Sequence, residues 1–267
     1  MRHGLSKAET IVIKVGTGTL THENGKMNLN SMERLVREIA ELSNEGKHIV
    51  LVTSGAVGVG LGKLNMGRKP KDMAAKQVLA SVGQCELMHI YSKLFSEYGI
   101  IVGQILLTRD VTDNPIKAKN AYNTFKGLLD RGIVPIVNEN DAISTDELAT
   151  VDTFGDNDTL SAMVAELIKC DLLIILSDID GLYDKDPHEH NDAKIIDLVK
   201  SVDDEILSYA GEGKSALGKG GMKTKLSAAK KCLSNGIDIA IINGKDMKNI
   251  TDLLEGKNVG TLFSSKQ

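Results

Sequence analysis

Val134-Pro-Ile-Val-Asn-Glu-Asn-Asp141 is the stretch from which both the fold and a binding site can be predicted. It is followed shortly by Phe154-Gly-Asp-Asn-Asp-Thr-Leu-Ser-Ala162. The apolar run at 133–137 predicts a buried strand that ends in two amides and two carboxylates. A second polar cluster, after Gly155, leads into apolar residues at helical spacing. Both clusters would flank one loop at the edge where open α/β sheets bind ligands.

The same polar residues also have a purely structural interpretation. Asn and Asp are common in turns and at helix N-caps, and Asp158 could cap the helix that follows it. For a single residue this interpretation is the commoner one. So many amide and carboxylate groups beside one strand end nevertheless favour a binding site.

Composition excludes several classes of protein. The chain has 267 residues, a net charge of −4, 3% aromatic residues and no Trp, so it offers little for binding a polyanion or stacking bases. It has no apolar run long enough to cross a membrane and no signal-like start. Cys85, Cys170 and Cys232 form no Cys-x-x-Cys pair and are expected in the core. We expect a cytoplasmic protein that binds neither nucleic acid nor membrane.

Strands and helices are expected to alternate along almost the whole chain. Apolar β-branched runs predict strands at 11–15, 48–52, 100–107, 133–137, 171–176 and 238–242, and helical periodicity appears at 32–42, 73–97, 118–129, 160–167 and 226–233. This alternation predicts an α/β fold, a three-layer αβα sandwich with a central, mainly parallel sheet. We treat 1–267 as a single domain, from which the polar segment 182–217 makes an excursion.

Three features indicate that the chain handles phosphate. Lys14 lies inside an apolar strand, where its ammonium group needs an acidic partner unless the strand is at an edge. Glycines follow the first two strands and let backbone N–H groups approach an anion. A glycine-lysine segment, 218–225, precedes a helix whose N-terminus adds positive potential, although an exposed basic loop is the alternative.

The familiar nucleotide signatures are absent. Gly213-Lys-Ser215 has Ser208 where a P-loop needs its first glycine, and no His-Arg-Asp or Asp-Phe-Gly of a protein kinase occurs. Phosphoryl transfer still needs positive charge around the transferred group. Lysines from two distant segments could supply it.

Seven short motifs are distributed along nearly the whole chain, from Lys14 to about Phe263. They are Lys14-Val-Gly-Thr-Gly-Thr19, Thr53-Ser-Gly-Ala-Val57, Ala80-Ser-Val-Gly-Gln84, Val137-Asn-Glu-Asn-Asp141, Gly155-Asp-Asn-Asp158, Ser177-Asp178 and Gly220-Gly-Met-x-Thr-Lys225. Together they resemble the amino acid kinase family. Single motifs are shared by its acetylglutamate, aspartate, carbamate and uridylate kinases. The combination of Asn-Glu-Asn-Asp with Gly-Gly-Met-x-Thr-Lys is similar to the branch that phosphorylates glutamate.

The resemblance implies ATP-dependent phosphorylation of the γ-carboxylate of L-glutamate to L-glutamyl 5-phosphate, the first step of proline biosynthesis. It implies that Lys14 and Lys225 stabilise the transferring phosphoryl group while Asp158 holds both lysines. The resemblance further implies that glutamate is bound by Ser54, Asp141 and Asn157. It implies that the nucleotide is held by Lys14, Ser177, Asp178, Lys219, Gly220, Gly221, Met222, Lys223, Thr224 and Lys225. Mg²⁺ would bridge phosphate oxygens and keep its waters, so we assign it no protein ligand.

The resemblance also raises expectations about organisation and regulation. The part at about 1–165 would bind the amino acid and the part at about 166–267 the nucleotide. Family members suggest a homo-oligomer, a dimer or tetramer, with proline as feedback inhibitor. Many carry an additional C-terminal RNA-binding-like (PUA) domain, whereas we expect the kinase domain only. A related kinase acting on acetylglutamate or aspartate, and a non-catalytic amino-acid or nucleotide sensor, are the alternatives.

The chemistry of the acceptor agrees with the resemblance. A carboxylate is already ionised at neutral pH, so its attack on phosphorus needs no general base. What remains is to bring two anions together and to neutralise their charge. The resemblance implies that Lys14 and Lys225 supply this charge and meet at Asp158.

Overall fold

The structure, a computed structural model, describes residues 2–22, 26–67, 70–108, 110–143, 157–187, 189–210 and 221–266. The strands are β1 Thr10–Val15, β2 His48–Val52, β3 Val102–Leu107, β4 Val134–Glu139, β5 Leu172–Ser177, β6 Leu198–Val199, β7 Asp238–Asn243 and β8 Thr261–Phe263. The α-helices are α1 Thr17–Leu20, α2 Leu29–Asn44, α3 Ala56–Lys63, α4 Met73–Ser96, α5 Asp110–Asp113, α6 Pro115–Leu129, α7 Asn157–Ile168, α8 Asp204–Ser208, α9 Met222–Ser234 and α10 Asn249–Leu254. A 3₁₀ helix, η1, spans Arg2–Lys7.

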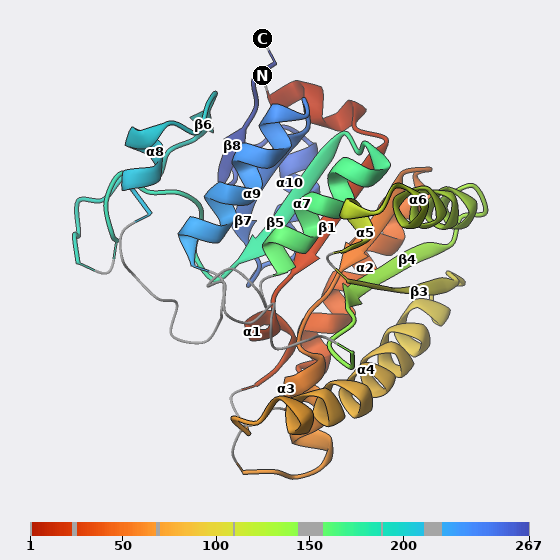
Figure 1. The fold of residues 1–267 in the computed structure, drawn as a ribbon. Coiled ribbons are helices and arrows are strands. Elements are labelled where there is room, and N and C mark those ends of the chain that lie inside the picture. Colours follow the sequence, from red (N-terminus) through yellow and green to blue (C-terminus); the bar gives the residue numbers. More distant parts are fainter. Residues whose placement is uncertain are drawn as a thin grey trace.

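One eight-stranded sheet runs through the middle of the molecule (Figure 1). Its strand order is β3-β4-β2-β1-β5-β7-β8-β6, and every neighbouring pair is parallel except β7 and β8. The predicted mainly parallel sheet is therefore confirmed. The four strands of the first half of the chain lie on one side of the β1–β5 junction and the other four on the opposite side.

Alternate residues of the central strands enter two separate cores. On β1, Ile11 and Ile13 join the core beneath α2, α4 and α10, whereas Val12 faces the core beneath α6, α7 and α9 (Figure 1). The side chains of these strand residues are fully buried because helices cover both faces, which explains the continuous apolar runs. The predicted three-layer sandwich is confirmed.

Most predicted elements lie where their periodicity placed them. At the start of α2 the side chain of Asn28 accepts a hydrogen bond from the N–H of Ser31, and Gly46, at φ +88°, lies in the turn between α2 and β2. The segment at 182–217 was expected as an excursion only. Its described part also supplies β6, an edge strand paired with β8.

Two local expectations need correction or completion. Cys170 and Cys232 are buried, as expected, but Cys85 is exposed, because it lies on the outer side of α4. None of the helices in the described part of the chain combines the length and apolar character that a membrane crossing requires.

The glycine-rich segment after β2 serves helix packing as well as a turn. Gly55, at φ +96°, precedes α3, and the glycines beyond it lie inside that helix. A Cβ on Gly60 would lie 2.0 Å from the carbonyl oxygen of Leu79, and one on Gly83 would lie 1.8 Å from that of Ala56. Helices α3 and α4 therefore touch backbone to backbone, a contact that the sequence analysis did not anticipate.

Gly83→Ala should lower the free energy of unfolding by about 2 to 3 kcal/mol, because the added methyl group forces α3 and α4 apart. The matched control is Gly127→Ala in α6, where the nearest atom would be 3.7 Å away. That change should stabilise the protein by about 0.5 to 1 kcal/mol, through the higher helix propensity of Ala. Urea unfolding measures both. Similar effects of the two substitutions would contradict the close crossing.

Candidate active site

Three charged side chains from distant parts of the chain meet at the carboxyl edge of the sheet. Lys14 lies near the end of β1, and Asp158 and Lys225 lie in the first turns of α7 and α9. Lys14 Nζ is 2.6 Å from Asp158 Oδ1, and Lys225 Nζ is 3.1 Å from Asp158 Oδ2. The expected meeting of two lysines at one carboxylate is confirmed. Their part in phosphoryl transfer stays a prediction.

The sheet explains why Lys14 reaches this point. β1 lies between β2 and β5, with Lys14 opposite Val52 and Ile175. The alternative of an edge-strand lysine is therefore wrong. Lys14 is 6% exposed, and its ammonium group has a partner, Asp158, at the start of α7, as burial of a charge requires.

Asp158 is fully buried and is the hub of the cluster. Burial by itself would raise the pKa of its carboxyl group, but Lys14 and Lys225 outweigh that effect and lower the pKa to about 2. The hydroxyl group of Thr224 donates a further hydrogen bond, of 3.0 Å, to Oδ2. Two ammonium groups share one carboxylate, so the cluster carries an excess positive charge that suits an anion such as a phosphoryl group.

The N-cap interpretation of Asp158 is wrong. Helix α7 starts at Asn157, so Asp158 already lies within the first turn. Its carboxylate is directed to Lys14, Lys225 and Thr224 instead of capping the helix. A capping residue would stand before Asn157, outside the described residues.

The start of α9 suits a phosphate. Gly221 is the N-cap residue and makes no side-chain capping bond, and Met222 opens the helix. Lys223 is exposed while Lys225 is buried, because residues two apart point to opposite sides of a helix. Two residues predicted to hold the nucleotide, Lys219 and Gly220, lie outside the described residues.

The predicted residues on β5 lie beside this cluster in the sheet. Ser177 ends β5, the strand next to β1, and is 5% exposed. Its hydroxyl group donates to Asp178 Oδ1 over 3.3 Å, and Asp178 itself is exposed. Their nucleotide-binding role stays a prediction.

The predicted glutamate-binding residues border the same edge. Ser54 Oγ donates to the carbonyl oxygen of Val15 and lies 3.1 Å from Thr17 Oγ1, so it joins the ends of β1 and β2. Asn157 is 7% exposed and donates from Nδ2 to the carbonyl oxygen of Thr53. Asp141 follows β4 and lines a cavity of about 360 Å³.

Sequence reasoning assigned no role to several polar residues that complete the site. Asn138, Gln84, Thr53 and Tyr91 are buried, and they form side-chain hydrogen bonds with one another or with Asn157. One signal was available for Gln84. It lies four residues after Ala80 and three before Leu87, on the buried face of α4, where a polar residue needs a partner.

Comparisons with known proteins agree on one family. A profile described as the amino acid kinase family matches residues 9–243. The glutamate 5-kinase of Clostridium perfringens is 52% identical over all of this chain and 99% of that protein, and the one from Listeria innocua is 51% identical over all of this chain and 97% of that protein.

Solved structures of low identity share the fold. A carbamate kinase from Giardia lamblia bound to AMP-PNP has a TM-score of 0.69 at 20% identity, covering 98% of this chain and 100% of that one. A UMP kinase from Bacillus anthracis has a TM-score of 0.67 at 14% identity, covering 97% of each chain. At such identities these structures bear on the fold alone.

Asp158→Asn should lower the free energy of unfolding by about 2 to 4 kcal/mol at neutral pH, because it leaves two nearly buried ammonium groups without their carboxylate. The pKa of Asp158 is lower in the folded protein than its ordinary value of 3.8, so its contribution is complete above about pH 4 and is lost as the pH falls toward about 2. The difference between wild type and Asp158→Asn, measured by urea unfolding, should shrink by about 2 kcal/mol over that range.

Asp192→Asn is the matched control for this measurement. Asp192 pairs with Lys185 at the surface, where an ion pair contributes little to stability. Its substitution should leave the unfolding free energy almost unchanged at neutral pH. Equal losses at the two positions would contradict the role of Asp158 as the buried hub.

Proposed function

This chain belongs to the amino acid kinase family, and on that premise we propose that it transfers the γ-phosphoryl group of ATP to the γ-carboxylate of L-glutamate. The product would be L-glutamyl 5-phosphate, formed in the first step of proline biosynthesis. The observation that carries the proposal is the pair Lys14 and Lys225 on one buried carboxylate. The two glutamate 5-kinases, about half identical over the full chain, support glutamate as the acceptor.

The lysine cluster supplies what this reaction needs from the protein. An acceptor carboxylate and a polyphosphate repel each other, and the excess positive charge of Lys14 and Lys225 offsets that repulsion. Asp158 fixes both ammonium groups before the substrates arrive, so little reorganisation is needed during transfer. The acceptor is already ionised, so the site needs no base to activate it.

The arrangement of the sheet supports different binding roles for the two halves of the chain. Ser54, Asn157 and Asp141 belong to the part at about 1–165, whose strands β1 to β4 form one side of the sheet. Ser177 and the start of α9 belong to the part at about 166–267, on the other side. We assign amino-acid binding to the first part and nucleotide binding to the second. Lys14, on the central β1, lies between them.

The carboxylate of the cluster is not a candidate metal ligand. Asp158 is already engaged by two lysines and by the Thr224 hydroxyl group. Nor do the described residues contain a group of three or more side chains suited to hold a metal ion. When bound with the nucleotide, Mg²⁺ would neutralise charge on its phosphates, and we assign this ion no protein ligand.

The family relation alone prompts three further proposals. We assign the chain to the cytoplasm, to a homo-oligomer of two or four copies, and to inhibition by proline as the end product of the pathway. Size measurement in solution tests the assembly. Adding proline to the assay below tests the inhibition.

The function is tested by trapping acyl phosphate as its hydroxamate after incubation with ATP and Mg²⁺. L-glutamate, N-acetyl-L-glutamate and L-aspartate are compared as acceptors, and L-glutamate should give a kcat/KM at least about a hundredfold higher than either other acid. Preference for another acid would identify a related kinase. Nucleotide binding without any acyl phosphate would instead identify a sensor.

Lys225→Met should lower kcat at least about a hundredfold, because it removes one preorganised charge beside the transferred group while keeping the aliphatic stem. Stability should fall only modestly, since Asp158 keeps Lys14 as a partner. Lys230→Met is the matched control, because Lys230 is an exposed lysine on the same helix, α9. A near-normal kcat for Lys225→Met would remove this lysine from the mechanism.

A further inference from the structure

One residue beside the lysine cluster uses its hydrogen-bond donors inside the protein. Thr224, which precedes Lys225 on α9, donates from its backbone N–H to the carbonyl oxygen of Gly221 over 3.2 Å. Its hydroxyl oxygen lies 3.0 Å from Asp158 Oδ2 and 2.8 Å from the same carbonyl oxygen. A hydroxyl group has one proton, so it serves one of these two acceptors at a time. While it does, Thr224 has no proton left for a phosphate oxygen.

Asp158 is the stronger of the two acceptors. Burial alone would raise the pKa of this carboxyl group, but Lys14 and Lys225 lower it to about 2, so the group is ionised at neutral pH. A hydrogen bond to an ionised oxygen is stronger than one to a neutral carbonyl oxygen. The carbonyl oxygen of Gly221 also accepts from the N–H of Thr224 already. The hydroxyl proton therefore belongs to the bond with Asp158.

Two consecutive residues of α9 thus reach the same oxygen atom. Neighbouring side chains on a helix point about 100° apart and do not normally face each other. Here Lys225 Nζ lies 3.1 Å from Asp158 Oδ2, and Thr224 Oγ1 lies 3.0 Å from it. Lysine reaches this point through a flexible four-carbon stem, whereas Thr has a short side chain that is stiff at χ1. The bond from Thr224 therefore fixes Oδ2 relative to the backbone of α9 more firmly than the lysine does.

We propose that Thr224 is a positioning residue for phosphoryl transfer, which acts through Asp158 and Lys225 and does not itself hold the nucleotide. The inference rests on the proposed function, and it replaces the role that the family resemblance implied for this residue. By anchoring Oδ2, the hydroxyl group keeps the ammonium group of Lys225 where it can stabilise the transferred phosphoryl group. A shift of about 1 Å in such a group can cost about a hundredfold in rate.

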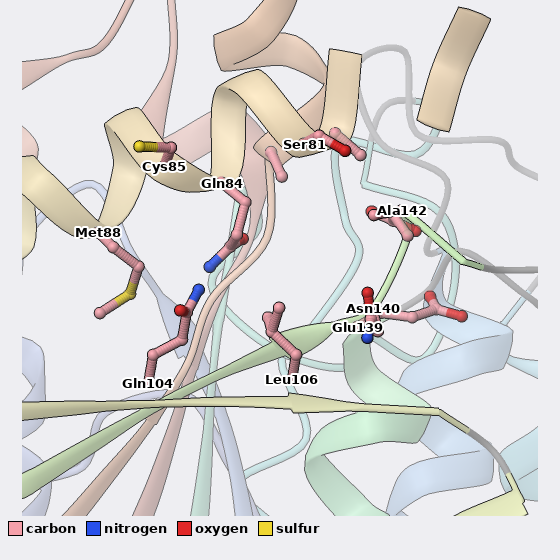
Figure 2. Close-up of a pocket in the computed structure, with 12 residues that line it drawn as sticks. Ser81, Gln84, Cys85, Met88, Gln104, Leu106, Glu139, Asn140 and Ala142 are labelled. Carbon is pink, nitrogen blue, oxygen red and sulfur yellow. The ribbon is translucent and has the colours of Figure 1, made fainter. Parts of the chain in front are cut away.

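The cavity that Asp141 lines is built from the other half of the chain. Figure 2 shows side chains from α4, from β3 and from the end of β4 around it. The described residues that line it all lie between Ala56 and Ala142, so Thr224 is not among them. A change at Thr224 should therefore leave the binding of glutamate unaffected.

Two competing explanations make different predictions for Thr224→Val, which removes the hydroxyl group and keeps the shape of the side chain. If Thr224 holds the nucleotide, the variant should have a higher KM for ATP and a normal kcat at saturating ATP. If Thr224 only stabilises the fold, the free energy of unfolding should fall while the kinetic constants of the folded protein stay the same. Our proposal predicts a lower kcat with unchanged KM values.

The test measures kcat, KM for ATP and KM for L-glutamate in the hydroxamate assay. Thr224→Val should lower kcat about tenfold to a hundredfold, with both KM values within about threefold of wild type. Thr224→Ala, which also lacks the hydroxyl group, should behave in the same way. Thr224→Ser keeps the hydroxyl group and should retain kcat within about threefold.

Thr124→Val is the matched control. Thr124 is an exposed residue of α6, and its hydroxyl group donates to the carbonyl oxygen of Asn120. The substitution makes the same chemical change away from the cluster, so all three constants should stay as in wild type. A similar loss of kcat at both positions would contradict a specific role for Thr224.

A double substitution tests whether Thr224 acts through Lys225. In a Lys225→Met background, Thr224→Val should lower kcat by less than about threefold further, because the ammonium group that it positions is gone. An equal loss in both backgrounds would overturn the proposal. So would an unchanged kcat in Thr224→Val, or a loss that Thr224→Ser does not recover.

A binding measurement separates this inference from the proposed function. Calorimetric titration with ATP and Mg²⁺, without glutamate, should give Thr224→Val a Kd within about threefold of wild type. Binding weakened tenfold or more would return Thr224 to the nucleotide site and overturn the inference. Failure of the proposed function would instead appear in the unmodified chain, as an absence of glutamate-dependent acyl phosphate.

Discussion

The fold and the candidate chemistry both depend on one buried carboxylate. Asp158 holds Lys14 through one oxygen and Lys225 through the other, and so connects the central strand to the starts of two helices. Burying three charges is costly unless each has a partner. The cluster is stable because each oxygen of the carboxylate is paired with an ammonium group, and it attracts anions because one positive charge remains in excess.

The polar network around Asn157 is likewise held by contacts between buried polar groups. Each buried amide is oriented by a neighbour, starting from a backbone N–H that can only donate. The helix carrying Gln84 is held close by the glycines at its crossing with α3, where no side chain could fit. Packing and hydrogen bonding therefore fix the position of Gln84 together.

Much of this protein could be predicted from local patterns. The apolar strand runs, the amphipathic face of α2 and the glycine before α9 are signals within a few residues, and the structure has strands or helices at each place. The pairing of Lys14 and Lys225 with Asp158 could be expected because a buried lysine needs a carboxylate and the motifs resembled a known family. The packing role of the glycines in α3 could not be predicted in this way, because their contacts are with α4, a separate helix later in the chain.

Periodicity and motifs were therefore enough to predict the class of fold, the family and the charged residues of the lysine cluster. The contacts of each polar side chain became known only from the folded chain. It showed that Asp158 binds two lysines instead of capping a helix, that Lys14 lies on a central strand, and that Gln84 Nε2 is buried without a hydrogen-bond partner among the described residues. The physical reason is that hydrogen-bond partners and burial arise between segments far apart in the chain, where no local pattern reports them.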